Sequence, residues 1–359
     1  MKNQNKTVGQ LSRRKFLGTA ASAAAAISIL PLSTSCTSTP SVAAAGSKLN
    51  SKFAGVQIGC ITYSFRDMGS NVETILKACV DSGCSSVELM STGIEEYLGA
   101  PAAPPRPQRP QGPPPAGAPA GAPAGRSGGG GFQRVPLTPE QQAAQDKYTA
   151  DLKAWRLSVP MTKFEELRKK FNDAGVDIHI VKFSPSRWSD EEIDYTFKAA
   201  KALGAKGVCE EIGEEAVNKL GPIAEKHGMF AIFHQHAQFA TEGFSYDPFL
   251  AVSPAVMMNF DAGHFFGTTG IHPNTIIEKY HDRIFSIHLK DKTGPNTTPP
   301  NMNQVWGQGE MPIADVLNLL KEKKWPIYVD IELEYPIAPW STSVKEVSTC
   351  VNYARQILM

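Results

Sequence analysis

The sequence lacks several features that would assign it to a particular class of protein. It has no apolar run long enough for a permanent transmembrane span, and its formal net charge is only +1 over 359 residues. No basic stripe alternates with aromatic residues, which argues against nucleic acid as a partner. The cysteines show neither metal-site nor disulfide-framework spacing. We therefore expect a chain with a large core, in which most cysteines are small buried residues: Cys60, Cys79, Cys84, Cys209 and Cys350.

The first fifty residues have the composition of an export signal followed by a tether. Arg13 and Arg14 resemble a twin-arginine signal, and a short run of small and apolar residues follows them. The segment that ends at Cys36 resembles a relaxed lipoprotein cleavage site, so Cys36 is a candidate for a lipid anchor. We expect residues 1–50 to lie outside the fold and the protein to be exported to the periplasm or cell envelope. A basic cytoplasmic tail is the alternative.

From residue 51 to residue 359, short apolar runs alternate with amphipathic stretches, which is typical of repeated βα units. Eight units predict a single (β/α)8 TIM barrel. A doubly wound open sheet is the alternative, but no glycine-rich phosphate turn follows the first strand. Strands are expected at residues 55–61, 86–90, 177–183, 206–212, 229–236, 256–261, 284–290 and 327–334, and helices at 72–81, 163–173, 190–203, 214–227 and 314–323.

A low-complexity insertion interrupts the barrel after its second strand. Residues 100–135 are mostly proline, alanine and glycine, a composition that cannot bury enough apolar surface to order itself. The insertion is therefore predicted to be disordered. Residues 138–157 then read as a helix with Thr138 and Pro139 at its start. This helix either closes over the barrel mouth or lies on the barrel flank.

The last predicted strand carries charges where a barrel strand is normally apolar. Its aliphatic residues alternate with Asp330, Glu332 and Glu334, so the three carboxylates are expected to point into the barrel. Burying a lone ionised carboxylate costs several kcal/mol, so cations or a metal should lie nearby.

Four preceding strands also deliver polar side chains to one end of the barrel. Imidazole nitrogens with carboxylate oxygens are ligands for Mn, Fe, Co, Zn or Mg, so a divalent metal site is expected there. Any one of these histidines could equally be a structural hydrogen-bonding residue. The pattern places Glu210 and Glu211 at the end of the fourth strand, His234 and His236 on the fifth, Asp261 and His264 at the end of the sixth, and Ser286, His288 and Lys290 inward on the seventh, with Phe285, Ile287 and Leu289 outward.

These motifs together resemble the xylose-isomerase-like barrel superfamily of sugar phosphate isomerases and epimerases. The motifs are His-Gln-His at 234–236, Phe-Asp-Ala-Gly-His at 260–264, His-Leu-Lys-Asp at 288–291, Gly-Gln-Gly at 307–309 and Ile-Glu-Leu-Glu at 331–334. The resemblance extends over residues 56–358. It implies a metal held by His234, Asp261, His288 and Glu332, with His264 against the substrate. His234 departs from the pattern, because the epimerases have a metal-bound catalytic glutamate there. Glu211 is a candidate for the missing carboxylate.

The resemblance also implies a reaction on a sugar. Glu332 or Glu211 would remove the proton beside a carbonyl, a metal would stabilise the resulting enediolate, and Lys290 and His264 would orient hydroxyls or polarise the carbonyl. Further candidates for substrate binding are His236, Lys182, Glu88 and Glu334.

Three functions are compatible with these residues. The favoured one is isomerisation or epimerisation of an unphosphorylated keto sugar, because phosphorylated sugars are scarce outside the cytoplasm and no phosphate cradle is visible. A metal-dependent lyase or hydratase for 3-keto-glycosides would use the same enediolate. A carbohydrate-binding lipoprotein without catalysis is the third alternative, although so many inward carboxylates argue against it.

Overall fold

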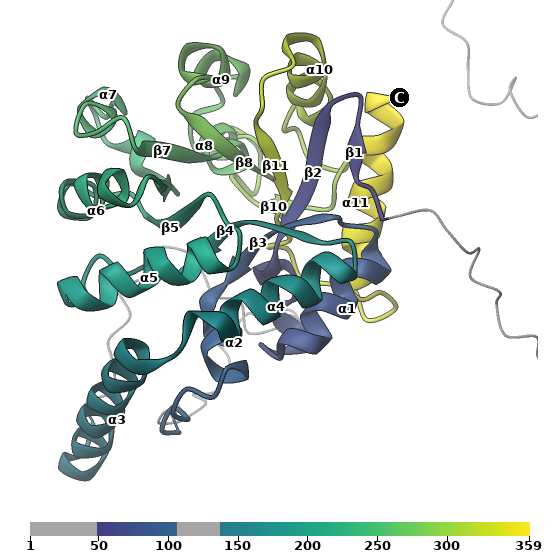
Figure 1. The fold of residues 1–359 in the computed structure, drawn as a ribbon. Helices are drawn as coiled ribbons and strands as arrows, with labels where there is room; N and C mark the ends of the chain where they lie inside the picture. Colours follow the sequence, from purple (N-terminus) through teal and green to yellow (C-terminus); the bar gives the residue numbers. More distant parts are fainter. Residues whose placement is uncertain (1–48, 106–136) are drawn as a thin grey trace, which may run out of the picture. The chain divides into compact units, whose positions relative to one another are not determined.

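The computed structural model describes residues 49–105 and 137–359. The export segment, Cys36 and most of the insertion lie outside the described residues. Eight parallel strands pair in the order β2-β11-β8-β7-β6-β5-β4-β3, and β3 pairs back with β2, so the sheet closes (Figure 1). This confirms the (β/α)8 TIM barrel. The barrel strands are β2 (Val56–Ile61), β3 (Ser86–Met90), β4 (Asp177–Lys182), β5 (Gly207–Glu211), β6 (Phe230–His234), β7 (Val256–Asp261), β8 (Ile284–Leu289) and β11 (Tyr328–Ile331).

The predicted helices form in the connections between these strands. Where a helix meets the next turn, a glycine with left-handed backbone often ends it; Gly83 and Gly228 have φ of 84° and 64°. The helices are α1 (Val72–Ser82), α2 (Ser91–Tyr97), α3 (Pro139–Ser158), α4 (Met161–Asp173), α5 (Asp190–Ala202), α6 (Glu214–His227), α7 (Asp247–Leu250), α8 (Ala262–Thr269), α9 (Asn274–Tyr280), α10 (Ile313–Lys323) and α11 (Ser343–Leu358), with 3-10 turns η2 (Thr62–Met68) and η3 (Gln238–Ala240).

Short strands flank the barrel at two places. β1 (Lys52–Phe53) pairs antiparallel with β2, and β9 (Asp291–Lys292) pairs antiparallel with β10 (Asn303–Gln304). The Asp291 carboxylate fixes the loop that follows β10, because it accepts the backbone N–H groups of Gly307, Gly309 and Met311. The loop with the Gly-Gln-Gly motif is therefore tied to the end of β8.

Apolar side chains pack in two separate clusters. The larger one fills the space between the strands and the surrounding helices. The smaller one lies inside the barrel and consists of Ile180, Cys209, Ile232 and Phe285. The five cysteines of the described residues are free and buried, as expected.

One orientation expected from alternation is wrong. Phe285 was predicted to face the outer helices, yet its ring belongs to the inner cluster. The register between β7 and β8 shifts here, since Met258 pairs with Ile284 and Asn259 with Ser286, which leaves Phe285 as an extra residue. Such a bulge changes the face to which a side chain points.

Helix α3 lies on the flank of the barrel, one of the two positions considered. Thr138 caps it through a reciprocal hydrogen-bond pair with Gln141. Its far end is anchored by Arg156, whose guanidinium donates to Glu95 at 2.8 Å and to Glu192 of α5 at 3.0 Å. In Figure 1 α3 points away from the ring of strands.

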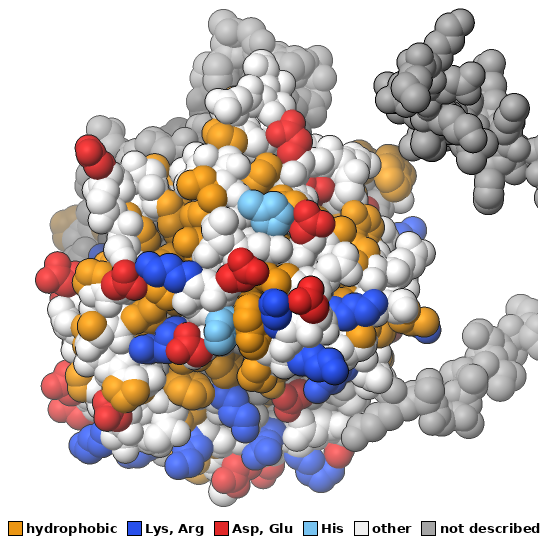
Figure 2. All heavy atoms as spheres, turned by 90° about the horizontal axis from the view of Figure 1, so that it is seen from above, with side chains coloured by type: hydrophobic (Ala, Val, Ile, Leu, Met, Phe, Trp, Pro, Cys, Tyr) orange, Lys and Arg blue, Asp and Glu red, His pale blue; other side chains and the backbone are white. Residues whose placement is uncertain are grey.

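The surface of the described residues shows a mixed distribution of side chains. In the described part of the chain, none of the helices combines the length and apolar character needed to cross a bilayer. On the face shown in Figure 2, side chains of both charge signs are interspersed with hydrophobic ones.

Candidate active site

The carboxyl ends of four neighbouring strands bring metal-binding side chains together. His234 ends β6, Asp261 ends β7, His288 lies near the end of β8, and Glu332 directly follows β11. One ligand atom from each of these residues lies within 4.8 Å of all the others, and the four side chains are buried. Strands of a parallel barrel all end at the same rim, which explains why residues nearly a hundred positions apart meet. We call these four residues the mouth cluster.

Lys290 supplies a positive charge to the mouth cluster. Its ammonium lies 2.8 Å from Asp261, 2.6 Å from Glu332 and 2.8 Å from Glu334, and the residue is only 2% exposed. Burial alone would lower the pKa of Lys290, but the three carboxylates outweigh it and hold that pKa well above its usual range. The ammonium therefore compensates part of the buried negative charge.

Each histidine of the mouth cluster also faces a second carboxylate. His288 Nδ1 lies 3.0 Å from Glu332, while its Nε2 lies 2.8 Å from Glu88. His234 Nε2 lies 3.3 Å from Asp261, while its Nδ1 lies 3.2 Å from Glu211. A carboxylate behind a ligand imidazole fixes which nitrogen carries the proton. In this arrangement Glu88 and Glu211 orient the two rings.

Below the mouth cluster lies a polar layer that the sequence analysis largely missed. The Asn259 amide donates to Glu88 at 2.7 Å and accepts from the Ser286 hydroxyl at 2.8 Å. His179 donates to Asp330 at 2.9 Å. Asp330 points inward as predicted, but its partner is this deeper histidine, so it is not one of the mouth cluster.

A bulge explains why the sequence does not predict His179 as an inward residue. Val87 pairs with Ile178 and Glu88 with Ile180, so His179 is an extra residue in β4 that regular alternation does not place. Asn259 carries no charge and is therefore not one of the charged or imidazole side chains that predict the site. The sequence does contain one signal for Asn259: a polar amide side chain stands directly before Phe260 and Asp261 in a buried strand.

Glu211, His236 and Lys182 form a polar group at the rim. Glu211 accepts from Lys182 at 2.6 Å and lies 3.1 Å from His236 Nδ1. Burial would raise the pKa of Glu211, but the two histidines and Lys182 hold it well below its usual range. His236 lies beyond the end of β6, and its side chain is 51% exposed. Glu210 turns the other way and accepts the backbone N–H of Ser186.

His264 stands beside the mouth cluster from the first turn of α8. Asp261 accepts the backbone N–H of His264 at 2.7 Å and so caps α8 while also facing the cluster. His264 Nε2 lies 3.4 Å from Glu334 but makes no hydrogen bond to any residue that the structure describes. Burial holds the pKa of His264 well below its usual range, which keeps the ring neutral.

The donor set fits a divalent metal ion. Buried polar atoms normally have hydrogen-bond partners. Among the described residues, His288 Nδ1 and Glu332 Oε2 make no hydrogen bond of suitable geometry, although they lie 3.0 Å apart and Lys290 pairs with Glu332 Oε2 at 2.6 Å. Both atoms point into the mouth cluster. Two imidazoles with two carboxylates suit Mn, Fe, Co or Zn.

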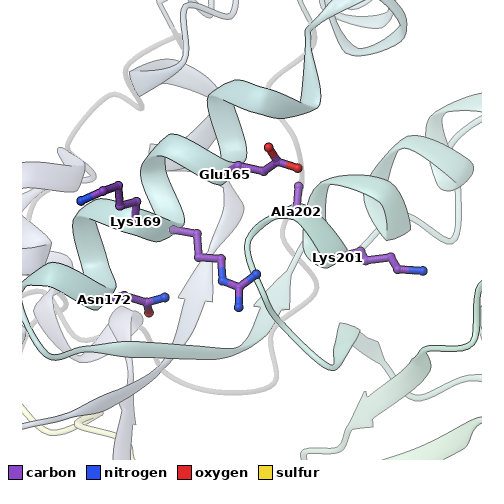
Figure 3. Close-up of a pocket in the computed structure, with 6 residues that line it drawn as sticks. Glu165, Lys169, Asn172, Lys201 and Ala202 are labelled. Carbon is purple, nitrogen blue, oxygen red and sulfur yellow. The ribbon is translucent and has the colours of Figure 1, made fainter.

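A hollow on the helical layer is unrelated to this site. It has a volume of about 330 Å³ and lies between α4 and α5 (Figure 3). Its lining comprises Glu165, Arg168, Lys169, Asn172, Lys201 and Ala202, none of which belongs to the mouth cluster. Glu165 and Arg168 of this hollow are exposed and suit control substitutions.

Comparison with known proteins relates part of the chain to a family of barrel proteins. Residues 176–350 match the family model described as "Xylose isomerase-like TIM barrel". Inosose dehydratase from Clostridium beijerinckii is 34% identical over 80 residues, which is 21% of this chain and only 26% of that enzyme.

Two solved structures resemble nearly the whole barrel. A xylose isomerase domain protein from Alicyclobacillus acidocaldarius has a TM-score of 0.54 at 12% identity and covers 84% of this chain and 99% of its own. A sugar phosphate isomerase/epimerase from Parabacteroides distasonis has a TM-score of 0.50 at 15% identity, covering 87% and 97%. At such low identities the likeness shows the fold alone.

Proposed function

Because the chain belongs to the xylose isomerase-like TIM barrel family, we propose that it is a metal-dependent enzyme that removes a proton beside the carbonyl of an unphosphorylated keto sugar. One observation carries this proposal: four ligand atoms from His234, Asp261, His288 and Glu332 converge within 4.8 Å at the barrel mouth. The proposed outcome is isomerisation or epimerisation.

The mouth cluster would hold the metal. Its four side chains supply two nitrogens and two carboxylate groups, with His234 and His288 oriented from behind by Glu211 and Glu88. When bound, a divalent ion supplies Lewis-acid polarisation of a carbonyl and stabilises negative charge.

Of the two candidate bases, Glu332 fits the role better than Glu211. Both oxygens of Glu211 already face donors, namely Lys182 on one side and the two histidines on the other. Glu332 belongs to the mouth cluster itself, where its Oε2 lies 2.6 Å from the Lys290 ammonium and 3.0 Å from His288, whereas Glu211 lies behind His234. We therefore assign proton removal to Glu332 and an orienting role to Glu211.

Lys290 and His264 would bind the sugar oxygens. The Lys290 ammonium, 2.6 Å from Glu332, is placed to stabilise negative charge that develops beside the base. The neutral His264 ring has an Nε2 without a hydrogen-bond partner among the described residues, and this nitrogen can donate to or accept from a sugar hydroxyl according to the tautomer.

Elimination is the second candidate. His234 replaces the second carboxylate that a two-base epimerisation needs, while Glu211 raises the pKa of His236 and favours its protonated form. Glu332 would take the α-proton, and His236 would protonate the oxygen that leaves the β-carbon. The local similarity to an enzyme named inosose dehydratase supports this reaction class.

The two outcomes are distinguished with metal-loaded protein in heavy water, incubated with plain ketoses and with 3-keto-glucosides. Deuterium incorporation without release of the aglycone supports isomerisation or epimerisation, and aglycone release supports elimination. Glu332→Gln should abolish either reaction, whereas Glu165→Gln on α4 should not. A purified protein without a stoichiometric divalent ion, whose thermal midpoint is insensitive to chelators, would contradict both candidates and favour a non-catalytic sugar-binding protein.

We also propose that the protein is exported through its twin-arginine segment and anchored by lipid at Cys36. Replacement of Arg13 and Arg14 by lysine should retain the protein in the cytoplasm. Cys36→Ser should leave export intact but release the protein from the membrane fraction. Fractionation of cells measures both.

A further inference from the structure

A second hollow adjoins the polar rim. It has a volume of about 460 Å³ and lies between the loop after β4 and the beginning of α6. Ser184, Ser186 and Arg187 line one side, and Glu211 lines another. Because the Glu211 carboxylate also contacts His234 and His236, this hollow and the mouth cluster share a wall. The hollow therefore lies next to the mouth cluster.

The walls of this hollow are held in place. The buried Glu210 links the loop after β4 to the end of β5. Its carboxylate accepts the backbone N–H groups of Ser186 and Glu211, each at 2.8 Å. Ser184 has a left-handed backbone with φ of 53°, and its N–H donates to the Cys209 carbonyl. Such backbone is strained for a residue other than glycine and persists where its surroundings impose it, often at binding sites.

The charges around the hollow define what it can hold. Glu211, Glu214 and Glu215 line it with only one positive residue, Arg187. These carboxylates would repel a phosphate or a carboxylate. Among the residues that the structure describes, the Arg187 side chain has no ion-pair or hydrogen-bond partner. Sugar hydroxyls can donate to the carboxylates and accept from the guanidinium and the serine hydroxyls.

We propose that this hollow is a subsite for a second, uncharged sugar unit, so that the substrate is a keto-glycoside and not a free monosaccharide or a sugar phosphate. The inference rests on the proposed function, because the mouth cluster must act on the first sugar. The volume of the hollow, about 460 Å³, lies within the usual range of about 300–1,000 Å³ for small-molecule sites.

The test compares two substrates of metal-loaded protein: the 3-keto derivative of a glucose disaccharide and 3-keto methyl glucoside. Arg187→Ala should lower kcat/KM for the disaccharide by about tenfold, since a hydrogen bond to a charged group is lost. Turnover of the methyl glycoside should stay within about twofold. Arg168→Ala, an exposed arginine of the hollow between α4 and α5, should change neither. An unaltered preference in Arg187→Ala would overturn the subsite.

A binding measurement separates this inference from the proposed reaction. Calorimetry with the unoxidised disaccharide should show binding to the wild-type protein that Arg187→Ala weakens, with an unchanged thermal midpoint. If that pattern holds but no keto sugar is turned over, the subsite stands and the proposed reaction fails. If glucose 6-phosphate binds more tightly than the disaccharide, or the disaccharide does not bind, the subsite for an uncharged sugar is wrong.

Discussion

The lower and upper halves of the barrel interior are both buried, but the lower half is mainly apolar, with His179 and Asp330 as a polar pair, whereas the upper half holds the mouth cluster. On β6, Ile232 lies in the lower half and His234 in the upper half, two residues further along the same face. β8 repeats the contrast with Phe285 and His288. A buried apolar side chain contributes about 1.5–3 kcal/mol to stability, whereas a buried ion pair is at best close to neutral. We infer that the lower half stabilises the barrel and that the upper half is retained for chemistry.

The strongest test of this contrast is Glu332→Gln in the upper half. Loss of the proposed base should reduce kcat/KM by about 10³-fold, while the protein still folds. Steady-state kinetics and urea unfolding measure the two effects. Glu165→Gln is the control, and a Glu332→Gln variant with full activity would remove Glu332 from the mechanism.

The reverse effect is expected in the lower half. Phe285→Ala should destabilise the protein by about 3–5 kcal/mol, because it opens a cavity among Ile180, Ile232 and Tyr328. Urea unfolding measures the change. A loss below about 1 kcal/mol would contradict the stabilising role of the lower half.

Removal of the metal should lower the thermal stability of the protein through the ligands of the upper half. A ligand present at 100 times its Kd stabilises the folded state by about 2.7 kcal/mol, so chelation should lower the thermal midpoint by the corresponding amount. In Asp261→Asn the midpoint should respond much less to added metal. An equal response in both proteins would place the metal elsewhere.

The last effect concerns Glu88, which lies between the two halves. Burial opposes its charge, but His288 outweighs burial and lowers the pKa of Glu88 from 4.5 to about 2. Glu88 therefore contributes stability above pH 4.5 that is lost as the pH falls towards 2. In metal-free protein, Glu88→Gln should reduce the slope of unfolding free energy against pH in this window by up to about 1.4 kcal/mol per pH unit. Identical slopes would contradict the shift.

Much of the architecture could be predicted because local periodicity carries it. Several elements matched to the residue, among them β3, β7 and α6, and the predicted mouth residues His234, Asp261, His288 and Glu332 do converge. Alternation failed at Phe285 and His179, since a bulge depends on the neighbouring strand. The eighth strand is shorter than expected and ends at Ile331.

The sequence by itself determined the repeated βα units and the set of carboxylates and imidazoles at the strand ends, because burial and periodicity act locally along the chain. Only the tertiary structure decided which nitrogen of His234 and His288 faces the mouth cluster. It also decided that Lys290 compensates the cluster's charge and that Glu211 lies between it and a second hollow. These outcomes depend on distances between strands, which no pattern within one strand contains.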